Sequence, residues 1–143
     1  MKRNHDILGI TLVGILASLA IPAFRRVQIA SENSRLMHDY TTFAEGFKRY
    51  SIENGAYPPD GAFNPIPTNM EPYLGNAWLN SPVGGQWIWD HDQWGVTAAI
   101  SIRLSNATPH QMQKIDEQMD DGDLASGRFR RINWDRYAFI LEE

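Results

Sequence analysis

The hydrophobic pattern of this chain begins with an uncharged run from Ile7 to Phe24, ILGITLVGILASLAIPAF. From Arg25 onward, apolar residues recur at three- and four-residue steps with charged residues between them, which is the period of an amphipathic helix. Together the two stretches predict one long N-terminal helix. The apolar stripe of its second half consists of Val27, Ala30, Met37, Tyr40, Phe43, Ala44, Phe47 and Tyr50.

The end of this helix is also marked in the sequence. Asn54-Gly55 suits a helix C-terminus and Pro58-Pro59 cannot continue a helix, so we expect the helix to stop near Ile52 to Asn54. Pro22 lies inside the predicted helix. Because proline removes a backbone donor and clashes with the preceding turn, we expect a kink or a local loss of helix there.

The uncharged run has the length of a membrane anchor. As a helix it would span roughly 27 Å, close to the thickness of the hydrocarbon core of a bilayer. Lys2 and Arg3 favour an N-terminus in the cytoplasm, whereas Arg25-Arg26 oppose that orientation. A cleaved secretory signal would look similar at its start, but the residues after Ile21 do not resemble a small-residue cleavage site. We therefore expect an anchor in residues 1–24 and a globular domain in residues 25–143.

The remaining chain predicts a small antiparallel sheet. Residues 56–81 are rich in proline and glycine, which indicates an irregular connection with a helical turn near residues 70–74. Residues 86–90 and 94–104 have the alternation of two strands, with a turn at Asp90-His91-Asp92-Gln93. Two-residue alternation places Trp87 and Trp89 on one strand face, and likewise Ile100, Ile102 and Leu104.

A short helix and two closing strands complete the prediction. Thr108-Pro109 supplies an N-cap and a proline at the first position of a helix that runs to about Met119. Residues 129–132 and 137–141 have the composition of strands. The stripe of the long helix and the apolar face of the sheet must cover each other. The expected fold class is α+β: a long N-terminal α-helix, half membrane-spanning and half amphipathic, packed on a small antiparallel β-sheet.

Two segments carry a resemblance to a known family. Gly14 to Phe24 resembles the end of the N-terminal segment of type IV pilins and type II secretion pseudopilins, and Asn54-Gly55-Ala56-Tyr57-Pro58 is similar to the turn that closes the long helix of major pseudopilins. Residues 81–89 and 115–127 also look like pilin-like segments. The glycine-aromatic junction of the family and the glutamate inside its apolar run are missing, and His5 and Asp6 stand near the place of that glutamate.

The resemblance implies a pilin-like fold and a structural function. Such a subunit waits in the bacterial inner membrane as a single-pass protein with a periplasmic globular domain. Pilus or secretion assembly machinery then extracts it, and it polymerises into a periplasmic or extracellular helical filament, a homo-oligomer. The implied filament-core and membrane residues are Ile7, Leu8, Ile10, Leu12, Val13, Ile15, Leu16, Leu19, Ile21, Pro22 and Phe24, and His5 and Asp6 would make polar contacts between subunits.

Within the family, the closing turn and the cysteine-free C-terminal region favour a type II secretion pseudopilin over a type IV pilus subunit. The sequence leaves open whether a leader is removed and residue 1 methylated. A second interpretation is a non-polymerising, membrane-tethered binding module with a tryptophan-rich sheet. In that case Trp87, Trp89 and Trp94 would stack on a sugar or a peptide, although core and subunit contacts also explain them.

Composition narrows the function further. A chain of 143 residues has room for one modest domain beside the helix, and the absence of cysteine excludes disulfides and thiolate zinc sites. A net charge of −4 gives no global signal for nucleic acid, and we expect Arg128, Arg130, Arg131 and Arg136 on a solvated strand face. The four histidines are dispersed and no nucleophile elbow or phosphate loop occurs, so we do not expect an enzyme.

One group of residues has the chemistry of a metal site. Asp120, Asp121 and Asp123 crowd three carboxylates beside Gly122, and calcium prefers such oxygen ligands. The resemblance points the same way, because major pseudopilins hold calcium in their C-terminal loops. The spacing is not that of an EF-hand, however, and Asp-Asp-Gly after a helix is also typical of a solvated stop. We expect no other cofactor.

Overall fold

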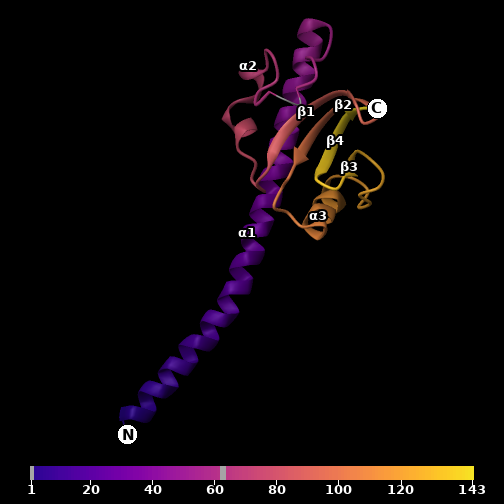
Figure 1. Ribbon diagram of the computed structural model, residues 1–143. Helices are drawn as coiled ribbons and strands as arrows, with labels where there is room; N and C mark the ends of the chain where they lie inside the picture. Colours follow the sequence, from indigo (N-terminus) through magenta and orange to yellow (C-terminus); the bar gives the residue numbers. More distant parts are fainter. Residues whose placement is uncertain (1, 62–63) are drawn as a thin grey trace. The chain divides into compact units, whose positions relative to one another are not determined.

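The computed structural model describes the backbone of residues 2–61 and 64–143 and the side chains of residues 20–61 and 64–143. It is an α+β structure with a long N-terminal helix and a four-stranded antiparallel sheet, as expected (Figure 1). The chain divides into two compact units, residues 1–32 and 33–143. The elements are α1 (Lys2–Asn54), α2 (Glu71–Leu74), the 3-10 helix η1 (Asn76–Leu79), β1 (Gln86–Gln93), β2 (Val96–Arg103), α3 (Pro109–Met119), β3 (Phe129–Asn133) and β4 (Arg136–Glu142).

Helix α1 ends where the sequence predicts. Gly55 follows it with a φ of 81°, and its N–H donates to the carbonyl of Ser51 at 2.8 Å. The Asn54 side chain donates to the carbonyl of Tyr50 at 3.0 Å, so two carbonyls of the last turns are satisfied. Pro22 lies within α1 and the helix continues through it, so the expected local loss of helix does not occur.

The membrane expectation needs correction. Among the described residues, no helix is both long enough and apolar enough to cross a bilayer, which contradicts a single-pass protein of the inner membrane. The physical reason is the charge on the described part of α1, where Arg25, Arg26 and Glu32 interrupt the apolar residues soon after Ala20. The side chains of Ile7 to Leu19, from which that expectation mainly came, lie outside the described residues.

The sheet has the strand order β1-β2-β4-β3, and its inner face packs on the second part of α1. Cross-strand pairing sets Trp89 beside Ile100 on this face, and Ile100 beside Phe139. Phe47 of α1 stacks on Trp89 with ring centroids 3.9 Å apart, and all four side chains are buried. The predicted partnership of helix stripe and sheet face is therefore confirmed within residues 33–143.

The turn between β1 and β2 is not where the sequence predicts it. Gln93 pairs with Val96, so the turn residues are Trp94 and Gly95, with φ values of 58° and 78°. Asp90 is a strand residue that pairs with Ala99. Its carboxylate is buried on the outer face of the sheet, where it accepts hydrogen bonds from Ser101 and Arg136. Leu104 lies beyond β2 and is exposed, contrary to its predicted place on the inner face.

Helix α3 follows its sequence signals. The Thr108 side chain accepts a hydrogen bond from the N–H of Gln111 at 3.1 Å, which caps the helix as predicted. Met112 and Ile115 are buried in the same core as the inner face of the sheet. Gln111 also donates to the Asn33 side chain at 2.8 Å, a link between α3 and α1 that joins residues far apart in sequence.

The segment between α1 and β1 closes the other side of this core. Trp78 of η1 lies edge-on to Phe43 of α1 with ring centroids 5.0 Å apart, and η1 contacts β1. Gly46 permits this close approach, because a Cβ there would lie 2.9 Å from the carbonyl oxygen of Tyr73. In contrast, the small cluster that includes Ala99 and Ile140 on the outer face consists only of residues of the sheet strands.

Candidate functional site

Three carboxylates meet at the C-terminal end of α3. Asp116, Asp120 and Asp121 each place one oxygen within 4.8 Å of the other two. Two of the three predicted calcium candidates are thus brought together. Asp123 is not a member of this acidic cluster, and its carboxylate instead accepts the N–H of Ala125 at 2.9 Å. Asp116 is not among the predicted candidates, although its four-residue separation from Asp120 is the spacing of neighbours on a helix surface.

Asp116 is the unusual member of the acidic cluster. Its side chain is buried and neither carboxylate oxygen has a hydrogen-bond partner of good geometry. Burial, followed by the charges of Asp121 and Asp120, raises the pKa of Asp116 to about 6, and only the backbone N–H of Gly122 acts against this rise. A buried carboxylate without a positively charged partner is costly. The described structure therefore leaves a negative charge here that a cation would stabilise.

The loop after α3 holds the other two carboxylates in place. Asp120 accepts the N–H of Arg128 at 2.6 Å, and Asp121 accepts the Ser126 hydroxyl at 2.6 Å. The bond from Ser126 is the main reason that the pKa of Asp121 is lowered. Gly127 has a φ of 75°, and a Cβ there would lie 2.0 Å from a carboxylate oxygen of Asp120. A glycine is thus required for the loop to close around Asp120.

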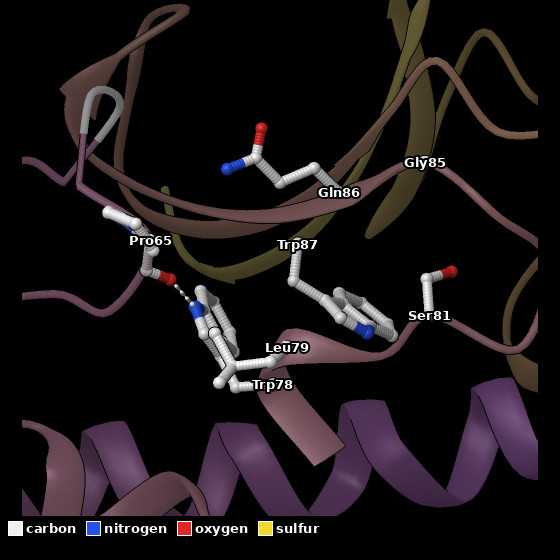
Figure 2. Close-up of a pocket in the computed structure, with 7 residues that line it drawn as sticks. All are labelled: Pro65, Trp78, Leu79, Ser81, Gly85, Gln86 and Trp87. Carbon is white, nitrogen blue, oxygen red and sulfur yellow. Dashed lines mark hydrogen bonds between the residues drawn. The ribbon is translucent and has the colours of Figure 1, made fainter. Parts of the chain in front are cut away.

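Two of the three tryptophans considered for ligand stacking belong to the core. Trp87 lines a cavity of about 200 Å³ together with Trp78, and both are buried (Figure 2). Figure 2 shows the Trp78 indole directed at Pro65, to whose carbonyl it donates at 2.8 Å. The Trp89 indole donates to the carbonyl of Pro58 at 3.0 Å. The stacking interpretation is therefore wrong for Trp87 and Trp89, whereas Trp94 is partly exposed.

Apolar side chains are exposed on the first part of α1. Ile21, Phe24 and Val27 are 69%, 71% and 67% exposed, and their three-residue spacing keeps them near one side of the helix. Pro22 is also exposed. The side chains of the other predicted filament-core residues, and those of His5 and Asp6, lie outside the described residues.

No family model, curated protein or solved structure matches this chain. Any functional conclusion therefore depends on the residues themselves and on their geometry.

The C-terminal arginines do not form one solvated face. Arg136 is buried and its guanidinium lies 3.2 Å from the Asp90 carboxylate. Arg130 pairs with Glu143, and Arg131 donates to the carbonyl of Trp134 at 3.0 Å. The expectation of a solvated face is wrong for Arg136, because its side chain lies across the outer face of the sheet toward Asp90.

Proposed function

We propose that this chain is the structural subunit of a filament of the type IV pilus or type II secretion pseudopilus kind, assembled through its N-terminal helix. The observation that carries the proposal is the exposure of Ile21, Phe24 and Val27 on α1. Ile21 and Phe24 belong to the uncharged run that starts at Ile7, and Val27 follows it after Arg25 and Arg26. The α+β layout and the two segments that resemble pilins and pseudopilins support the same function.

A second copy of the chain is the natural partner for these side chains. Burial of apolar surface contributes about 25 cal/mol per Å², so an uncovered apolar helix gains stability by packing on another. Each copy offers the same helix, and a head-to-tail contact that does not close into a ring generates a helical filament. We propose that successive subunits pack their N-terminal helices together along the filament axis.

Electron microscopy and sedimentation of the full chain test this proposal. We expect helical fibres from the unmodified chain and a sedimenting fraction reduced about tenfold or more by Phe24→Asp, because a carboxylate buried without a partner costs at least 1–3 kcal/mol. Phe24 is exposed, so the melting temperature should not change. Ile52→Asp is the matched control, since Ile52 is an exposed apolar residue near the other end of α1 and the fibres should persist.

Two results would contradict the filament. If the unmodified chain forms no fibres at any concentration, it does not polymerise by itself. That result is the one expected of a non-polymerising binding module. If Phe24→Asp and Ile52→Asp have equal effects, the first part of α1 is not the interface.

We further propose that the acidic cluster binds calcium and thereby fixes the loop after α3. Calcium takes six to eight oxygen ligands, of which Asp116, Asp120 and Asp121 would supply carboxylates. The fit depends on Asp116, whose buried oxygens lack partners of good geometry. Bound calcium would supply the positive charge that this buried carboxylate lacks.

Thermal unfolding of the chain with and without calcium tests whether the acidic cluster binds the ion. At a calcium concentration a hundredfold above Kd, we expect the melting temperature of the unmodified chain to rise by about 5–10 °C. Asp116→Asn should abolish the rise and should itself raise the melting temperature without calcium, because it removes a buried charge. Asp123→Asn is the control, since Asp123 lies outside the acidic cluster and the response should remain. A calcium response that survives Asp116→Asn would exclude this site.

A further inference from the structure

A groove of about 530 Å³ lies on the outer face of the sheet, opposite the helix-covered face. Its lining combines two tryptophans, Trp94 and Trp134, with two arginines, three aspartates and two side-chain amides. No aliphatic side chain is part of this lining among the described residues. Such a mixture of exposed aromatic rings and polar groups differs from both a packed core and an ordinary solvated surface.

The two tryptophans enter the groove from opposite ends of the sheet. Trp94 lies in the turn that joins Gln93 to Val96, and Trp134 lies in the turn between β3 and β4. Arg136, which follows the second turn, pairs with Arg103 at the end of β2 remote from Val96. Because both indoles line one groove, the groove extends across the outer face between the two turns.

Trp94 is held in place although it is not buried. It is 48% exposed and has a φ of 58°, a strained backbone conformation that is rare for a bulky residue. The guanidinium of Arg136 lies over its ring, 5.1 Å from the ring centroid. Trp134 is more open, at 77% exposure. Two large aromatic rings are thus exposed at the groove, and neither belongs to the hydrophobic core.

Both arginines of the groove are paired with aspartates of its lining, and the third aspartate, Asp60, accepts the N–H of His91. Arg103 lies 3.1 Å from Asp135, and Arg136 lies 3.2 Å from Asp90. The lining therefore offers no excess positive charge to an anionic ligand. One buried donor remains, because Nε of Arg136, a residue only 9% exposed, has no hydrogen-bond partner.

We propose that the groove binds a neutral oligosaccharide of hexopyranose units. One face of such a sugar ring presents C–H groups that pack on an indole, and its hydroxyls both donate to carboxylates and accept from amides and guanidinium groups. A peptide fits less well, because the groove has no apolar pocket in which its aliphatic side chains could be buried. The edge of β1 is also occupied where the N–H of Gly61 donates to the carbonyl of Trp89 at 3.2 Å. This function is separate from filament assembly.

Calorimetric titration of the full chain with three tetrasaccharides, cellotetraose, chitotetraose and maltotetraose, tests the groove. We expect saturable binding of at least one of them, weakened about tenfold by Trp134→Ala and by Trp94→Asn. Asparagine tolerates the positive φ at position 94, so that variant should keep its fold and melt near the unmodified temperature. Ile52→Ala, an exposed apolar site on α1 away from the groove lining, should bind the sugar as the unmodified chain does.

Each other result overturns the proposal. The proposal is overturned if none of the three sugars binds, or if both tryptophan variants bind sugar as tightly as the unmodified chain does. It is also overturned if the chain binds only a sulfated polysaccharide or a peptide. Phe24→Asp should leave sugar affinity unchanged, so failure of the filament and failure of the groove give different results.

Discussion

Arg136→Leu will lower the free energy of unfolding by about 3–5 kcal/mol, because it leaves a buried carboxylate without its charged partner. Asp90 is only 1% exposed, and its other side-chain hydrogen-bond partners, the Ser101 hydroxyl and Trp94, carry no charge. Burial raises the pKa of Asp90, while Ser101 and then Arg136 act in the opposite direction. Urea unfolding of the variant and the unmodified chain measures the loss.

Arg49→Leu is the matched control for this prediction. Arg49 also pairs with a carboxylate, that of Glu53 at 3.9 Å, but the two side chains are 60% and 52% exposed, so its loss should cost at most about 1 kcal/mol. An equal loss of unfolding free energy in the two variants would show that the pair of Arg136 and Asp90 contributes no more to stability than an exposed ion pair does. Adding Asp90→Asn to Arg136→Leu should recover part of the stability, since the unpaired charge is then gone.

The same pair gives a pH dependence with a definite sign. Without Arg136 the pKa of Asp90 rises further, so the folded state holds that proton more tightly than the unfolded state does. The variant should therefore regain stability as pH falls through the raised pKa of Asp90, and lose it as pH rises. Unfolding curves at several pH values should show the difference between variant and unmodified chain shrink toward acid pH.

Trp89→Ala will cost about 3–5 kcal/mol, the typical loss for a large aromatic residue removed from a core. Trp89 is completely buried, stacks on Phe47, and donates its indole N–H to Pro58. The substitution therefore removes a contact between the sheet and α1 and also leaves a buried carbonyl without its donor.

Trp134→Ala is the control for Trp89→Ala, because Trp134 is the most exposed tryptophan of the described chain and its loss should change stability by no more than about 0.5 kcal/mol. Both variants are compared by urea unfolding at one pH. Similar losses in the two would mean that Trp89 does not hold the sheet on the helix.

The features that local sequence predicts well are those with local causes. The end of α1 at Asn54, the Thr108 cap of α3 and the inward faces of Trp87 and Trp89 each depend on neighbouring residues or simple periodicity. The turn after β1 was misplaced because Asp90 looks like a turn residue. Its burial depends on Arg136, which is far along the chain but close across the sheet.

The candidate sites show the same limit. Asp120 and Asp121 are adjacent in sequence and were found, whereas the buried state of Asp116 depends on how α3 packs. The groove between Trp94 and Trp134 could not be predicted, because it exists only once the strand order β1-β2-β4-β3 is known. That order is not visible in the spacing of apolar residues.

The strand order also determines when the sheet can form during synthesis. β4 follows the other three strands in the chain, yet it lies inside the sheet, between β2 and β3. β2 and β3 therefore have no common partner until β4 has emerged from the ribosome. The sheet can close only after residues 136–142 have been synthesised, and a chain truncated before Arg136 would expose two unpaired strand edges to aggregation.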